Sequence, residues 1–162
     1  SGCGSNFIER DGRLIPQNGQ ATMHDASEGK IRLMIVEDHT LVRQMISSRL
    51  QSEPDIEVVG EAADGQTAID LAHQLSPDVI VMDVSLPGMN GIAATHHITV
   101  ALPHIRVIVL SFFEKEVLEG TMLEAGAVQF LNKAVSMEEL LAAIRSSARS
   151  PGPPVLSHRT TP

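Results

Sequence analysis

The sequence has few of the features that mark secreted or membrane-bound proteins. Its single cysteine, Cys3, cannot form an internal disulfide and has no second thiol with which to bind a metal. The longest apolar runs, such as Ile105 to Leu110, have the length of a β-strand and fall well short of a membrane span. No charged segment followed by an apolar one opens the chain, so no secretory signal is visible. We therefore expect a cytoplasmic protein with no membrane contact.

Positive charge is also scarce. Between residues 31 and 149 the chain has 8 Lys and Arg against 16 Asp and Glu, which accounts for the whole formal net charge of -8. A surface that binds nucleic acid needs Lys and Arg to replace the counterions along the phosphates, and this acidic segment repels phosphates instead. We therefore expect no direct binding of DNA or RNA by this segment.

Composition divides the 162 residues into one domain and two tails. Residues 1–30 are rich in Gly, Ser, Asn and Gln, so we expect a flexible lead, or residues foreign to the native protein, with one short hairpin around Asp11-Gly12. Residues 31–149 are long enough for a domain with its own core. Residues 150–162 contain several Pro and Gly, which predicts an interdomain linker with the output domain absent.

The central domain alternates apolar, strand-like runs with segments of helical periodicity. The strands are expected at residues 31–36, 56–62, 78–82, 105–110 and 127–131. Helices are expected between them, and a last helix is expected after Ser136, which is a favourable N-cap. Because parallel strands need crossover connections, this order predicts an α/β fold: a single doubly wound parallel sheet of five strands with helices on both faces.

Polar and charged residues follow four of the predicted strands. Glu37 and Asp38 come after the first, Asp83 after the third, Ser111 after the fourth and Lys133 after the fifth. In open parallel sheets ligands bind at the carboxyl ends of the strands, so these side chains should converge. Three carboxylates repel one another unless a hard cation lies among them, and Mg²⁺ prefers oxygen ligands. The pattern predicts a Mg²⁺ site beside an attacking carboxylate, Asp83, with the Lys133 ammonium neutralising a transferring phosphoryl group.

Taken singly, these residues have ordinary structural explanations. Glu37 and Asp38 suit a solvated helix N-terminus, where carboxylates cap the helix and complement its dipole. Asp83 suits the turn before Pro87-Gly88, and Lys133 suits an ordinary surface position. Their joint occurrence at the ends of predicted strands favours a functional site over these separate structural explanations.

Four segments resemble the receiver domains of bacterial two-component response regulators. They are Met34-Ile35-Val36-Glu37-Asp38-His39, Val81-Met82-Asp83-Val84-Ser85-Leu86-Pro87-Gly88-Met89-Asn90-Gly91, Val109-Leu110-Ser111, and Ala125-Gly126-Ala127 through Lys133. The resemblance covers residues 31–149, and residues 37–44 are most similar to the subfamily with helix-turn-helix output domains of the LuxR, NarL and FixJ type. It implies a flavodoxin-like (βα)5 fold with strand order 2-1-3-4-5.

The resemblance also implies a role for each site residue. Asp83 would be the phosphoacceptor, Lys133 would pair with the phosphate, and Ser111 and Phe130 would be the switch hydroxyl and the switch aromatic. Mg²⁺ would be held by Glu37, Asp38, Asp83 and the backbone carbonyl of Ser85. A sensor histidine kinase or a small acyl phosphate would donate the phosphoryl group, and phosphorylation could bring two copies together. The domain would then be a signalling module rather than an enzyme, and its output would be transcription.

Two positions depart from the family pattern. Phe130 lacks the hydroxyl of a tyrosine. Ala134 follows Lys133 where the family often has a cis-proline, so we expect a trans bond between Lys133 and Ala134.

Three other functions can be compared with that of a phosphorylated receiver. A flavodoxin-type cofactor binder needs a Ser, Thr or Gly phosphate loop where this chain has Glu37-Asp38. A phosphatase of the haloacid dehalogenase type needs an aspartate where Ser85 stands. A degenerate receiver that binds partners without phosphorylation remains the alternative.

Overall fold

The computed structural model describes residues 7–10, 13–16, 29–112 and 115–150. Near the start of the chain, β1 (Phe7–Arg10) and β2 (Arg13–Pro16) pair antiparallel, which confirms the predicted hairpin, although its turn at residues 11–12 lies outside the described residues. The predictions for the rest of residues 1–28 and for residues 151–162 also lie outside them. No helix in the described ranges is long and apolar enough to cross a membrane.

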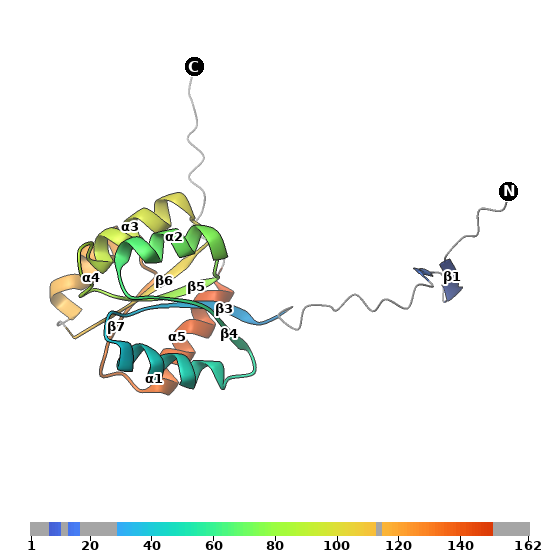
Figure 1. Ribbon diagram of the computed structural model, residues 1–162, viewed down its shortest axis with the longest axis horizontal. Helices are drawn as coiled ribbons and strands as arrows, with labels where there is room; N and C mark the ends of the chain where they lie inside the picture. Colours follow the sequence, from blue (N-terminus) through green and yellow to red (C-terminus); the bar gives the residue numbers. More distant parts are fainter. Residues whose placement is uncertain (1–6, 11–12, 17–28, 113–114, 151–162) are drawn as a thin grey trace, which may run out of the picture.

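In the central domain, strands and helices alternate along the chain as predicted (Figure 1). The elements are β3 (Ile31–Val36), α1 (Thr40–Gln51), β4 (Ile56–Ala62), α2 (Gly65–Leu75), β5 (Val79–Asp83), α3 (Gly91–Ala101), β6 (Arg106–Ser111), α4 (Lys115–Glu124), β7 (Gln129–Asn132) and α5 (Met137–Arg149). The five strands form one parallel sheet in the order β4-β3-β5-β6-β7. Counted within the domain, this is the order 2-1-3-4-5, so the predicted fold is confirmed.

The helices lie in two layers, one on each face of the sheet. In Figure 1, α1 and α5 lie below the sheet, and α2, α3 and α4 lie above it. Successive side chains of a strand point to opposite faces. In β3, Leu33 and Ile35 therefore join the buried cluster under α1 and α5, whereas Met34 and Val36 join the cluster under α2 and α3. All four of these side chains are at most 1% exposed. Such a strand reads as a continuous apolar run because it is covered on both faces.

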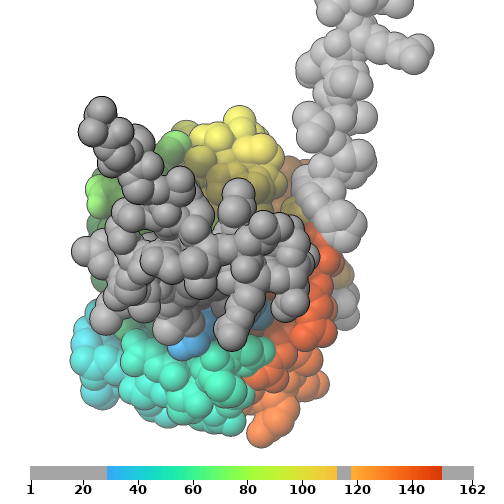
Figure 2. All heavy atoms as spheres, turned by 90° about the vertical axis from the view of Figure 1, so that its right-hand side faces the viewer, coloured from blue at the N-terminus to red at the C-terminus, as the bar shows by residue number. Residues whose placement is uncertain are grey.

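Ion pairs fasten α5 to the connection between α1 and β4. Arg145 Nε lies 2.7 Å from Asp55 Oδ2, and Arg145 Nη2 lies 2.9 Å from Glu53 Oε2. Figure 2 shows the teal surface around β4 beside the orange-red surface of α5. The hydrogen bonds from Arg145 hold the pKa of Asp55 below its usual value, and hydrogen bonds from Arg49 and then Arg145 do the same for Glu53. The two carboxylates in turn raise the pKa of Arg145.

The strand boundaries differ slightly from those predicted. Asp83 and Ser111 are the last residues of β5 and β6 rather than the first residues after them, because Asp83 pairs with Leu110 of β6 and Ser111 pairs with Asn132 of β7. The fifth strand of the domain begins at Gln129 rather than at residue 127, after Gly126, whose φ of 99° is in the left-handed region. The described backbone contains no cis peptide bond, so the bond between Lys133 and Ala134 is trans, as expected.

Candidate functional site

The predicted site residues converge at the carboxyl edge of the sheet. Glu37 follows β3, Asp83 ends β5, Ser111 ends β6, and Lys133 follows β7. Glu37 is 1% exposed, Asp83 3% and Ser111 1%. Buried carboxylates at these positions need compensation, since ionised groups are costly to remove from water unless they are paired. The parallel topology therefore brings together side chains that are almost 100 positions apart in the sequence.

Lys133 supplies the compensation for two of these carboxylates. Its Nζ lies 2.7 Å from Glu37 Oε2 and 3.0 Å from Asp83 Oδ2, and its own side chain is 8% exposed. The Lys133 N–H donates to the carbonyl of Ser111 at 2.9 Å, so the backbone at the end of β7 holds the lysine beside β6. Burial by itself would lower the pKa of Lys133, but hydrogen bonds with Glu37 and Asp83 outweigh it and raise this pKa. The ammonium is therefore firmly charged.

His39 and Arg43 contact the acidic pair after β3, and neither was among the predicted site residues. His39 Nδ1 lies 3.1 Å from Glu37 Oε1 and 3.0 Å from Asp38 Oδ1. The Arg43 guanidinium donates to the carbonyl of Glu37 at 2.6 Å. Nothing in the sequence distinguished these two residues from ordinary residues at a helix start, because their contacts depend on how the backbone turns from β3 into α1.

A tight loop after β5 positions the carboxylate of Asp83. The N–H of Ser85 donates to Asp83 Oδ1 at 3.1 Å, and the N–H of Gly91 donates to the carbonyl of Val84 at 2.9 Å. A Cβ added at Gly91 would collide with the carbonyl oxygen of Asp83, and Gly88 has a φ of 74°. The two glycines are thus needed for different reasons: close backbone approach at Gly91 and a left-handed turn at Gly88.

Two buried carboxylate oxygens in the site each have a single close partner among the described residues. Asp38 Oδ1 lies 3.0 Å from His39 Nδ1, and Asp83 Oδ2 lies 3.0 Å from Lys133 Nζ. One carboxylate oxygen each from Glu37 and Asp38 and one ring nitrogen of His39 lie within 4.8 Å of one another. Glu37 and Asp83 share the one Lys133 ammonium, and Asp38 lies beside the His39 ring, so the site has an excess of negative charge. Carboxylate oxygens are the ligands that a hard divalent cation prefers. The residues present therefore fit Mg²⁺.

Ser111 and Phe130, the two predicted switch residues, lie on neighbouring strands. Phe130 is 7% exposed, is paired with Val109 in the β6–β7 ladder, and packs in the same buried cluster as Met122 of α4. Ser111 ends β6 and is 1% exposed. Phe130 thus packs in the layer that contains α4, on the strand next to the one that Ser111 ends.

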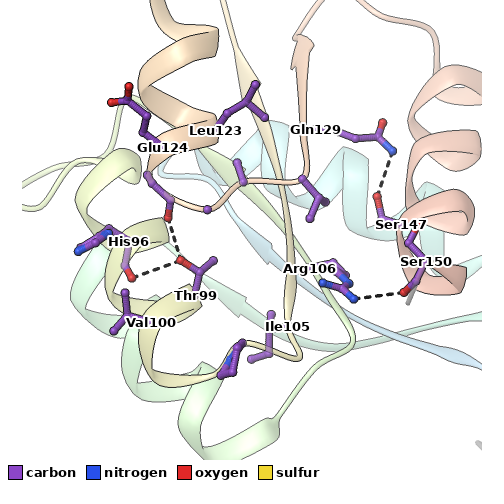
Figure 3. A pocket seen from close by; sticks show the side chains of 15 residues that line it. His96, Thr99, Val100, Ile105, Arg106, Leu123, Glu124, Gln129, Ser147 and Ser150 are labelled. Carbon is purple, nitrogen blue, oxygen red and sulfur yellow. Dashed lines mark hydrogen bonds between the residues drawn. The ribbon is translucent and has the colours of Figure 1, made fainter. Parts of the chain in front are cut away.

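A hollow elsewhere on the domain contains none of the predicted site residues. It has a volume of about 650 Å³ and lies among α3, α4, β6, β7 and α5 (Figure 3). The Arg106 guanidinium donates to the carbonyl of Ser150 at 3.2 Å, and the Thr99 hydroxyl donates to the carbonyl of Ala125 at 2.8 Å. Arg106 begins β6 whereas Ser111 ends it, so this hollow is at the opposite edge of the sheet from the acidic site.

The doubly wound parallel sheet with charged side chains at its carboxyl edge is the fold of a signalling domain, and sequence comparison gives its family. The response regulator receiver domain matches residues 33–145, and the chain belongs to this family. The transcriptional regulatory protein LiaR of Bacillus subtilis is 42% identical over 119 residues, which are 74% of this chain and 56% of LiaR. The response regulator VraR of Staphylococcus aureus is 42% identical over 121 residues, 74% of this chain and 57% of VraR. The chain thus spans a little over half the length of these curated relatives.

Solved structures agree with both the fold and the subfamily. The response regulator domain of Thermotoga maritima CheB has a TM-score of 0.70 and 34% identity, covering 75% of this chain and 98% of that one. The receiver domain of NarL from Mycobacterium tuberculosis has a TM-score of 0.72 and 30% identity, with the same coverage. A LuxR-family response regulator from Aurantimonas has a TM-score of 0.71 and 34% identity, covering 74% and 85%. The resemblance to the LuxR and NarL subfamily is thereby confirmed.

Proposed function

We propose that Asp83 accepts a phosphoryl group and that this modification switches the domain between two states. The observation that carries the proposal is the position of Lys133, whose ammonium lies 3.0 Å from Asp83 Oδ2 inside a buried acidic site. Phosphoryl transfer requires little covalent chemistry from the protein beyond the attacking group, so positioning and charge neutralisation are the main demands. A carboxylate held by the Ser85 N–H and facing a buried ammonium meets both.

The transfer can be written with the residues of this chain. An oxygen of Asp83 forms a bond to phosphorus while the bond between phosphorus and the donor breaks, and the donor leaves with that electron pair. Lys133 turns from the carboxylates toward the phosphoryl oxygens and pairs with their charge. Mg²⁺, held by Glu37, Asp38, Asp83 and the backbone carbonyl of Ser85, would supply further neutralisation of the phosphoryl oxygens when bound.

The switch is proposed to run through Ser111 and Phe130. A phosphoryl group adds charge and strong hydrogen-bond acceptors beside the end of β6, where the Ser111 hydroxyl can donate to it. Phe130 on the neighbouring strand packs beside α4 residues, so an inward turn of its ring would change the surface of α4 and β7. If Ser111→Ala leaves the structural response to beryllofluoride unchanged, this route is wrong.

The proposal also covers the phosphoryl donor, the pairing of two copies and the cellular location. The donor is a phosphohistidine on a sensor histidine kinase, or a small acyl phosphate, and phosphorylation favours pairing of two copies of the chain. The protein acts in the cytoplasm and controls transcription through an output domain. The support is that relatives matched over 74% of this chain are named as a transcriptional regulatory protein and as a response regulator.

Intact-mass analysis tests the acceptor chemistry directly. The chain is incubated with acetyl phosphate, with and without Mg²⁺, and compared with Asp83→Asn treated in the same way. We expect one added phosphate in the wild type with Mg²⁺, little without Mg²⁺, and none in Asp83→Asn. No added phosphate in the wild type would favour the degenerate receiver, and an addition that survives Asp83→Asn would place the acceptor elsewhere.

A further inference from the structure

Phe112 is an exposed aromatic residue beside Lys133, the lysine that pairs with the buried carboxylates of the site. It follows Ser111 directly after β6, and 77% of its surface is exposed. The chain has 4 Phe and no Trp or Tyr. Of the two Phe side chains whose burial is described, Phe130 is buried and Phe112 is exposed. A single exposed apolar residue needs no explanation by itself. The position of the Phe112 ring does need an explanation, because its centroid lies 5.1 Å from Lys133 Nζ.

This distance lies within the range in which an ammonium is attracted to the face of an aromatic ring. Lys133 thus has three partners: the carboxylates of Glu37 and Asp83, and the ring of Phe112. Phe112 and Lys133 also line a common hollow of about 360 Å³, together with Met45, Leu110 and Val135. The exposed ring therefore borders the lysine on the side of this hollow, whose other lining residues come mainly from α1 and from the start of α5.

The three partners differ in what they allow the ammonium to do. A carboxylate fixes the direction of one N–H, because that hydrogen bond points at a single oxygen. A ring face attracts the charge as a whole and leaves the N–H directions free. When a phosphoryl group forms on Asp83, the ammonium must redirect its N–H groups while staying in place, and a flexible lysine stem does not ensure this by itself.

We propose that the aromatic face of Phe112 is a positioning group for Lys133, which keeps the ammonium at the phosphoryl site while it changes hydrogen-bond partners. The proposal rests on the proposed phosphorylation of Asp83 and adds a residue outside the acidic set. It requires an aromatic ring at position 112 and not merely bulk. Loss of the ring should slow phosphorylation about two- to fivefold, the range that corresponds to a partly exposed contact of this kind.

Three substitutions at position 112 separate ring face from bulk. The rate of phosphate addition from acetyl phosphate with Mg²⁺ is followed by intact mass, and decay is measured after donor removal so that formation and hydrolysis are resolved. We expect Phe112→Ala and Phe112→Leu to form the product two- to fivefold more slowly, and Phe112→Tyr to restore the rate. Val100→Ala, which trims another side chain that is 69% exposed and lines the opposite hollow, is the matched control and should not change the rate.

The result that would overturn the proposal is a wild-type rate in Phe112→Leu or Phe112→Ala, or failure of Phe112→Tyr to restore it. A second measurement does not depend on phosphorylation. Protons on Cε of Lys133 should show an upfield ring-current shift in the NMR spectrum, which Phe112→Leu removes and Phe112→Tyr keeps. If the wild type shows this shift but takes up no phosphate, the proposed function fails while the contact stands. If it takes up phosphate without the shift, the positioning role fails alone.

Discussion

Lys133 and Asp83 form a buried ion pair across the edge of the sheet, with 3.0 Å between Nζ and Oδ2 and side chains that are 8% and 3% exposed. Glu37 shares the same ammonium at 2.7 Å. Two carboxylates therefore face one lysine, and the group of three carries a net charge of about -1 at neutral pH. The site has more negative charge than its own residues neutralise.

This imbalance predicts that removing Lys133 and removing Asp83 have unequal effects on stability in the absence of metal. Lys133→Met leaves two buried carboxylates uncompensated and should lower the free energy of unfolding by about 3 kcal/mol. Asp83→Asn brings the group to neutrality and should cost much less, or stabilise the fold. Urea denaturation without Mg²⁺ measures both. Equal losses for the two variants would mean that the carboxylates do not repel each other in the folded state.

The pair formed by Arg145 and Asp55 predicts a pH dependence of stability. The pKa of Asp55 is lowered from 3.8 by Arg145, and that of Glu53 is lowered from 4.5 by Arg49 and then Arg145. Because the folded values are lower than the unfolded ones, the pairs contribute stability above these values and lose it as the pH falls through the folded pKa. The stability difference between wild type and Arg145→Met should be constant near neutral pH and vanish in acid.

The difference in unfolding free energy between wild type and Arg145→Met can be measured by urea denaturation between pH 2 and 7, in steps of about one pH unit. Asp55→Asn should abolish most of the pH dependence of the difference, since Arg145 is the largest cause of the Asp55 shift. A difference that stays constant into acid would show that Arg145 acts through packing of its stem and not through its carboxylate partners.

Gly91 and Gly120 form a matched pair for a test of the loop after Asp83. A Cβ at Gly91 collides with the carbonyl oxygen of Asp83, whereas a Cβ at Gly120 in α4 meets nothing within 4 Å. Gly91→Ala should therefore lower the free energy of unfolding by at least about 2 kcal/mol. Gly120→Ala should raise it by about 0.5–1 kcal/mol, because alanine loses less entropy in a helix. Similar effects at both positions would contradict the described loop.

Much of the fold could be predicted from the sequence because β3, β5 and β6 are largely buried and contain nearly continuous apolar runs. The convergence of Glu37, Asp83 and Lys133 followed from parallel topology alone. The placement of Asp83 inside β5 did not, because strand ends depend on pairing with the neighbouring strand, here with Leu110 of β6. The contact of Phe112 with Lys133 was also missed, since it depends on side-chain direction after the strand has ended.

The account rests above all on Asp83 as the acceptor, and the acceptor can be mapped chemically. Borohydride reduces an aspartyl phosphate to homoserine, so the chain is treated with acetyl phosphate and Mg²⁺, reduced, digested and sequenced by tandem mass spectrometry. We expect homoserine at position 83, and aspartate retained at positions 38, 55, 64, 70 and 78. Homoserine at Asp38, or at no position in a chain that has gained phosphate, would contradict the account.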